Sequence, residues 1–287
     1  MIDRRNALGE SRLNTDAGLR VVELLLLWEG RVRNARLRAM LGIHFTTASR
    51  LVAAYRELNP AATEYGASTK SYLATPSIKA VLTDGTVEEY LALVDRTRAG
   101  TDPVVRVHMD LGDIESALFS LLHRACKDNS GVHITHGSMR SPGRSSREIW
   151  PHALVQAGRR WHVRAWCTQA MAFRDFSLGR IHDVRPLNAE RPAQADPALD
   201  IAWQTFVDLR LVAHPELSRE QQRLVQDEYF KGASTRGITE RGALLPYLIH
   251  DLRASLDVSK EQPPSFQLAV ADPSALAQWL LPVEQAC

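Results

Sequence analysis

Residues 160–166 read RWHVRAW, a run in which apolar side chains alternate with cationic ones. Alternation with a period of two is typical of a β-strand, because successive side chains point to opposite faces of a sheet. One face is expected to carry the core residues Trp161, Val163 and Ala165. The other face is expected to carry Arg160, His162, Arg164 and Trp166. The run therefore predicts a strand with one face for a core and a second face suited to an anion.

Short strand-like segments flank this run and are separated by glycine or polar turns. They read GVHITHGSM, REIWPHALVQ, FRDFSL and GRIHDVRPL, and the helix DIESALFSLLHRACKD precedes them with Asp113 as its N-cap. About five short strands within about sixty residues favour a small, strongly bent β-barrel of the SH3 or Sm type. We expect the helix and the barrel to occupy residues 103–187, after a linker at 96–103.

Residues 1–95 show the pattern of a winged helix-turn-helix domain. A first helix is expected from Asn14 or Thr15 to Gly30, a second, ARLRAML, after an N-cap at Asn34, and a third at about 46–58. The third helix should bury the face formed by Ala48, Leu51, Val52 and Tyr55. The segment TEYGASTKSYLAT, with GAS at its turn, then predicts a β-hairpin, which is the wing.

Small polar and cationic side chains are expected on the outer face of the third helix and on the wing. Ser and Thr can bond phosphate or bases there, Arg can read guanine through two hydrogen bonds, and a helix N-terminus attracts phosphate. The residues expected to contact DNA are Arg38, His44, Thr46, Thr47, Ser49, Arg50, Lys70 and Tyr72. The alternative is a plain helical bundle, which leaves the hairpin and the positive charge unexplained.

The formal net charge of +2 hides an uneven distribution of charge along the chain. Residues 31–79 carry eight Lys or Arg against two acids, residues 131–185 carry nine Arg against three acids, and residues 186–287 carry nine basic against fourteen acidic residues. Basic segments on particular domains indicate polyanion sites, and the alternative for each is a solvated face. No apolar run is long enough to span a bilayer and no signal peptide is evident, so we expect a cytoplasmic protein without a membrane partner.

The run IWPHALVQAGRRWHVRAW, followed by FRDFSLGRI, resembles the WYL domain of bacterial transcription regulators. The tripeptide that names this domain falls on Trp161, His162 and Val163, so His and Val replace Tyr and Leu. The element after it matches at Arg174, Phe176, Leu178, Arg180 and Ile181. The resemblance covers the middle domain.

The layout of the whole chain is similar to that of the WYL repressors found upstream of bacterial anti-phage defence operons. Those proteins have a winged helix-turn-helix, a WYL barrel and a C-terminal extension. The runs ASRLVAAYREL, KSYLAT, HPELSREQ and RGALLPYLIHDL fit this order. The resemblance implies a homodimer, an α+β dimerisation domain at 198–287, and a nucleotide or nucleic-acid effector bound at the WYL domain.

The tail itself supports a folded domain after a connector at 186–200. Ser218 and Gln221 predict a capping box for the helix REQQRLVQDEYF, and RGALLPYLIHDLRASL is amphipathic with Pro246 near its start. The fold class predicted for the chain is therefore α+β and multidomain.

Cations on the outer face of 160–166 and on the strand that follows are expected to form the effector site. Guanidinium groups bind phosphate through paired hydrogen bonds, and His or Ser side chains add donors. The residues expected there are Ser138, His152, His162, Arg164, Arg174 and Arg180. The alternative is a structural role, in which Arg180 pairs with Asp175 or Asp183.

These features predict a sequence-specific, non-enzymatic transcription regulator, a homodimeric repressor that reads a palindromic double-stranded DNA operator. The sequence holds no HExxH, GxSxG, Walker or CxxC motif, so we expect no metal, no cofactor and no catalytic residue. Two alternatives stay open: a WYL-type activator that responds to DNA damage, and an RNA-processing protein that uses the Sm-like barrel.

Overall fold

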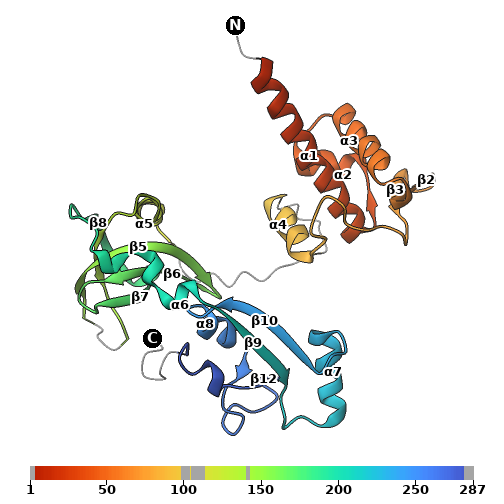
Figure 1. The fold of residues 1–287 in the computed structure, drawn as a ribbon. Coiled ribbons are helices and arrows are strands. Elements are labelled where there is room, and N and C mark those ends of the chain that lie inside the picture. The colour runs from red at the N-terminus through yellow and green to blue at the C-terminus, as the bar shows by residue number, and fades with distance from the viewer. Residues whose placement is uncertain (1–3, 98–103, 105–113, 140–142, 281–287) are drawn as a thin grey trace. The chain divides into compact units, whose positions relative to one another are not determined.

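The computed structural model describes residues 4–97, 104, 114–139 and 143–280. The chain forms two compact units, residues 1–107 and 108–287, and each is described by itself (Figure 1). The expected N-cap Asp113 and most of the expected linker at 96–103 lie outside the described residues. Within the described ranges, no helix combines the length and the apolar character needed to cross a membrane.

The first unit combines helices with a three-stranded sheet. Its elements are α1 (Arg4–Glu29), β1 (Arg31–Val32), α2 (Asn34–Leu41), α3 (Phe45–Leu58), a 3-10 turn (Pro60–Ala62), β2 (Thr63–Gly66), β3 (Ser71–Ala74) and α4 (Val87–Thr97). The sheet order is β1-β3-β2, so the predicted hairpin is present and its second strand also pairs with β1. The expected start of the first helix at Asn14 or Thr15 is wrong, since α1 begins at Arg4.

One face of α3 is buried against α1, as the helical spacing predicts. The buried residues of α3 are Ala48, Leu51, Val52 and Tyr55. Gly18 of α1 lies under this face, and a Cβ there would stand 2.7 Å from Cδ1 of Leu51. The absence of a side chain at Gly18 therefore lets the two helices approach closely.

A buried carboxylate that the sequence analysis did not single out joins α1 to the segment between β3 and α4. Glu23 accepts hydrogen bonds from the backbone N–H groups of Val81, Leu82 and Thr83 at 3.0, 2.9 and 2.8 Å. The Tyr55 hydroxyl donates to the same carboxylate at 3.1 Å. Burial raises the pKa of Glu23, but the three backbone donors and the Thr83 hydroxyl outweigh burial, and the net shift is downward.

The second unit begins with a five-stranded antiparallel sheet and a helix that packs on it. The elements are α5 (Ser116–Asp128), β4 (Val132–His136), β5 (Ser145–Ala157), β6 (Arg160–Cys167), β7 (Ala172–Ser177) and β8 (Ile181–Pro186). Helix α5 packs on β5 and β8 (Figure 1). The sheet order is β7-β6-β5-β4-β8. The five predicted strands are present, but a closed SH3- or Sm-like barrel is not confirmed, because no pairing among the described residues joins β7 to β8.

A connector with 3-10 turns at Ala193–Ala195 and Pro197–Leu199 leads to the C-terminal part of the same unit. This part contains α6 (Ile201–Gln204), β9 (Phe206–Ala213), α7 (Arg219–Phe230), β10 (Thr235–Arg241), α8 (Leu245–Asp251), β11 (Ala254–Ser255) and β12 (Leu268–Val270), followed by a 3-10 turn at Ser274–Leu276. The sheet order is β10-β9-β12-β11, and α7 packs on β9 and β10 (Figure 1). The predicted capping box is confirmed, since Ser218 and Gln221 exchange side-chain to backbone hydrogen bonds.

Candidate functional site

Helices α2 and α3 form a helix-turn-helix in the first unit (Figure 1). Gly42 ends α2 with a φ of 65°, a left-handed conformation that glycine adopts without strain, and its N–H donates to the Arg38 carbonyl at 2.9 Å. His44 then stands at the N-cap of α3. The predicted DNA contacts that are exposed here and on the wing are Arg38, His44, Thr46, Thr47, Arg50 and Lys70.

Two further predicted DNA contacts are engaged within the protein. The Ser49 hydroxyl accepts a hydrogen bond from Nδ2 of Asn34 at 2.7 Å, which holds α2 against α3. The predicted capping role of Asn34 is therefore wrong, since Arg33 occupies the N-cap of α2. Tyr72 is half-buried, and the guanidinium of Arg56 lies 4.9 Å from its ring centroid.

Two exposed aromatic side chains extend this surface, and the sequence analysis did not include them. Phe45, the first residue of α3, is 53% exposed, and Tyr65 on β2 is 58% exposed. The ring of Tyr65 lies 5.3 Å from that of Tyr72. Large apolar side chains left exposed beside cations are typical of a binding surface. The signal in the sequence was an aromatic residue, Phe45, directly before the predicted third helix at about 46–58.

In the second unit, β6 divides its side chains between two faces as the alternation predicts. Val163 and Ala165 are fully buried in the core that contains α5 residues. Trp161 packs edge-on against Phe119 of α5, with ring centroids 5.2 Å apart. The opposite face is not open, because its His162 and Arg164 are buried by contacts with the connector and α8.

A buried network of ion pairs holds Arg164. Its Nε and Nη2 donate to the two oxygens of Asp200 at 2.6 and 2.8 Å, and its Nη1 donates to Asp175 at 3.1 Å. The Tyr247 hydroxyl donates to the same Asp175 at 3.0 Å. Burial disfavours the charged form of both Arg164 and Asp200. The contacts with Asp200 and Asp175 nevertheless raise the pKa of Arg164. The contacts with His152 and Arg164 lower the pKa of Asp200.

A β-bulge brings His152 to this network. The register of β5 against β6 shifts between Pro151 and Ala153, which leaves His152 as the extra residue. Bulges re-aim a side chain out of the regular alternation of a strand. The imidazole Nε2 donates to Asp200 at 3.0 Å, and the ring packs edge-on against Trp203 of α6 at 5.3 Å.

His162 is a further predicted effector residue that the C-terminal part covers. Its ring lies against that of Tyr247 in α8, with centroids 4.9 Å apart. Burial lowers the pKa of His162, and the charge of Asp175 opposes this shift only in part. The face of β6 that we expected to bind a ligand is therefore a contact between the five-stranded sheet and the C-terminal part.

The six predicted effector residues do not form one cluster. In the register of β6 against β7, Arg164 pairs with Asp175, and Ala165 pairs with Arg174. Paired residues of antiparallel strands point to the same side, so Arg174 shares the face of the buried Ala165. The expectation that Arg164 and Arg174 line one pocket is wrong, because they lie on opposite faces of the sheet.

The structural alternative for Arg180 is also wrong. Asp175 pairs with Arg164, and Asp183 pairs with Arg185 at 2.8 Å. Arg180 makes no ion pair among the residues that the structure describes. Its guanidinium charge is therefore not neutralised by either of the acids that the sequence offered.

Two arginines and a histidine lie near the end of β4. His136 is 9% exposed, and its pKa is lowered to about 4 by burial and then by the charges of Arg180, Arg147 and His182. Ser138 follows two residues after His136 in the chain. Arg147 and Arg180, two cations of the basic segment 131–185, therefore lie near this end of β4. In the described part of the chain, no group of three or more His, Cys, Asp or Glu side chains could hold a metal ion.

Three protein-family models match the chain in order. Residues 14–96 match the BrxR transcriptional regulator winged helix-turn-helix domain, residues 117–186 match the WYL domain, and residues 206–276 match the BrxR transcriptional regulator C-terminal dimerization domain. The fold and these matches define a WYL-domain transcription regulator with an N-terminal winged helix-turn-helix.

Curated proteins with the name DNA-binding transcriptional repressor CapW are similar along almost the whole chain. The protein of Escherichia coli strain KTE188 is 32% identical over 271 residues, which are 91% of this chain and 90% of that protein. The Pseudomonas aeruginosa protein is 30% identical over 273 residues, with coverage of 91% and 90%. The Stenotrophomonas maltophilia protein is 28% identical, with coverage of 91% of both chains. This chain belongs to the family of these CapW proteins.

Proposed function

We propose that this chain is a homodimeric, sequence-specific DNA-binding repressor of an anti-phage defence operon, and that an effector bound at the WYL domain relieves repression. The observation that carries the proposal is the exposed polar and cationic surface at the start of α3 and on the wing. Relatives that align with about nine-tenths of this chain are named DNA-binding transcriptional repressors. These names support repression rather than activation. The protein acts by binding and not as an enzyme.

Helix α3 serves as the recognition helix. Thr46, Thr47 and Arg50 are exposed on its first turns, where their hydroxyl and guanidinium groups can form hydrogen bonds with base edges or phosphates. Arg38 on α2 and Lys70 in the turn of the wing are exposed cations suited to phosphate contacts. His44, at the N-cap of α3, is exposed and belongs to this surface, whereas Ser49 and Tyr72 lie at its edge and are engaged within the protein.

Two copies are needed for tight and selective binding. One helix-turn-helix reads one half-site, whereas a two-fold dimer places two recognition helices on a palindrome. The match of residues 206–276 to a dimerization domain supports this assembly. We assign DNA binding to residues 1–95, the WYL domain to 103–187 and dimerisation to 198–287.

The effector is a nucleotide or a nucleic acid that is held by its phosphates. Arg174, Arg180 and Ser138 make the direct contacts in this proposal, because they are not part of the buried ion-pair network on the other face of the sheet. Guanidinium groups suit phosphate, since they donate two parallel hydrogen bonds. Arg147 lies close enough to act, like Arg180, on the charge of His136, so a second guanidinium is near this end of β4.

His152, His162 and Arg164 transmit the effector signal in this proposal and do not contact the ligand. They connect the WYL sheet to Asp200 and Tyr247 in the C-terminal part. An effector changes DNA affinity only if it prefers one arrangement of the dimer over another. Residues at the contact between the sheet and the dimerisation domain are suited to link effector binding to the arrangement of the dimer.

Selection of an operator from a random duplex library tests the proposed function. The full-length protein should enrich a palindrome whose half-sites are centred about 10 base pairs, or a multiple of this, apart. The enriched sequence, placed in a reporter promoter, should be repressed when the protein is expressed. Enrichment of no sequence, or activation of the reporter, would contradict the proposal.

A further inference from the structure

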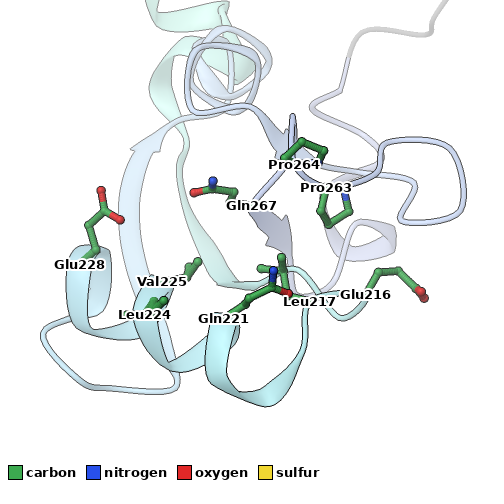
Figure 2. A pocket seen from close by; sticks show the side chains of 9 residues that line it. All are labelled: Glu216, Leu217, Gln221, Leu224, Val225, Glu228, Pro263, Pro264 and Gln267. Atoms are coloured by element: carbon green, nitrogen blue, oxygen red, sulfur yellow. The ribbon is translucent and has the colours of Figure 1, made fainter.

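A groove lies beside α7 on the surface of the C-terminal part (Figure 2). Its volume is about 460 Å³, and it is lined by α7 on one side and by Pro263 and Pro264 on the other. Leu224 of α7 lines it and is 68% exposed, whereas its neighbour Val225 is buried in the core. Apolar residues line the middle of the groove and polar or charged residues flank them. A groove of this kind with an exposed leucine in its wall indicates a surface that another protein segment covers.

The exposed surface of α7 carries opposite charges in its two halves. Arg219 and Arg223 lie in the N-terminal half, and Asp227 and Glu228 lie in the C-terminal half, with Glu220 as an acid in the basic half. In the described part of the chain, Arg219, Arg223 and Asp227 take part in no ion pair. If a second copy of α7 packs antiparallel to the first, the basic half of each helix lies opposite the acidic half of the other. A two-fold contact requires self-complementarity of this kind.

The two ends of the groove are acidic. Figure 2 shows Glu216 and Glu228 at opposite ends of the groove, with Leu224 between them. Carboxylates at these positions disfavour an acidic partner and favour one that brings arginine next to an apolar side chain. The basic half of α7, with Arg223 directly before Leu224, has this chemistry.

We propose that α7 is the two-fold contact between two copies of this chain. The two helices pack antiparallel, and Leu224 of each copy inserts into the groove of the other, against Pro263 and Pro264. The match of residues 206–276 to a dimerization domain includes all of α7 and the groove. The inference rests on the proposed homodimer and goes beyond it by assigning the surface that forms it.

Sedimentation equilibrium of the full-length protein over a concentration series tests this assignment. Leu224→Asp should raise the dissociation constant of the dimer by at least about 30-fold, as for an interface hot spot. Its circular dichroism should stay unchanged, because the side chain is exposed in the monomer. Leu199→Asp is the matched control, since Leu199 is an exposed leucine of the connector in the same unit, and it should leave the dissociation constant unchanged.

Charge reversal provides a second, independent measurement. Arg223→Glu and Asp227→Arg should each weaken the dimer by roughly 2- to 5-fold, as for exposed ion pairs, and the double variant should restore it. A dimer of unchanged strength in Leu224→Asp overturns the assignment, as does dissociation caused by Leu199→Asp alone. A wild-type chain that stays monomeric at every concentration contradicts the homodimer itself, and with it the dimeric part of the proposed function.

Discussion

Arg164 and Asp200 form a buried, bidentate ion pair between residues 36 positions apart in the chain. Nε and Nη2 of the guanidinium donate to the two carboxylate oxygens at 2.6 and 2.8 Å. Asp200 also accepts the backbone N–H of Trp203 at 3.3 Å and so caps α6. The Asp200 side chain therefore joins β6 to α6, the first helix of the C-terminal part.

Removing two charges from water is costly, and a buried pair offsets that cost only when its hydrogen-bonding groups are used. His152 and Asp175 complete the network around Arg164 and Asp200. We therefore interpret the network as the feature that specifies how the connector docks on the sheet.

Asp200→Ala should destabilise the protein by about 3–5 kcal/mol, because it leaves the Arg164 guanidinium buried with half of its partners. The free energy of unfolding is measured by urea denaturation followed by tryptophan fluorescence. Asp183→Ala is the matched control, since Asp183 pairs with Arg185 on the exposed part of the same sheet, and it should cost less than about 1 kcal/mol. Equal losses in the two variants would show that the buried pair has no special role.

Stability should fall as the pH decreases below about 6.5, in part because of His136. Burial and the nearby cations lower the pKa of His136 in the folded protein to about 4, so the unfolded chain binds the proton first. The contribution of His136 to the free energy of unfolding is complete above the pKa of the unfolded chain. It is lost as the pH falls toward the pKa of the folded protein. One such group gives a slope of at most about 1.4 kcal/mol per pH unit.

Urea denaturation at about pH 7 and about pH 5 measures this dependence. His136→Phe removes the titrating group, and the loss of stability between the two pH values should then become smaller. His123→Gln, at an exposed position on α5, should leave the loss as in the wild type. An unchanged loss in His136→Phe would assign the pH dependence to other groups.

Arg50→Ala should weaken operator binding by about 1–3 kcal/mol and relax preference at one base pair, if the guanidinium reads a base. Lys70→Ala should weaken binding to all sequences alike and lower the slope of affinity against salt by about 1, as for the loss of one phosphate contact. Fluorescence anisotropy on operator and scrambled duplexes at several salt concentrations separates the two effects. If both variants bind DNA with wild-type affinity, the DNA-binding surface lies elsewhere in the protein.

Arg174→Ala should leave the fold and the operator affinity close to wild type and abolish induction. The side chain is exposed on β7, so its loss removes a phosphate contact and not a core contact. A reporter strain should therefore show repression that the inducing condition does not relieve. Arg185→Ala, an exposed arginine of the same sheet, is the control and should be induced normally. Normal induction of Arg174→Ala would remove that arginine from the effector site.

Local spacing in the sequence was sufficient for the buried faces of β6 and α3. The alternation in RWHVRAW places Val163 and Ala165 in the core, and the helical spacing of Ala48, Leu51 and Tyr55 does the same for α3. Glycine at the end of α2 and the capping box of α7 also follow from single residues. Such features depend on the backbone geometry of one element, which neighbouring residues determine.

The tertiary structure alone decided what lies over the second face of β6. Asp200 and Tyr247 are far from Arg164 in sequence, and the path of the chain brings them over it. A bulge turns His152 toward the same acid, and a one-residue register places Arg174 on the opposite face. The alternating pattern shows which side chains share a face, but the partner that covers that face depends on contacts between distant segments, and those contacts have no local pattern in the sequence.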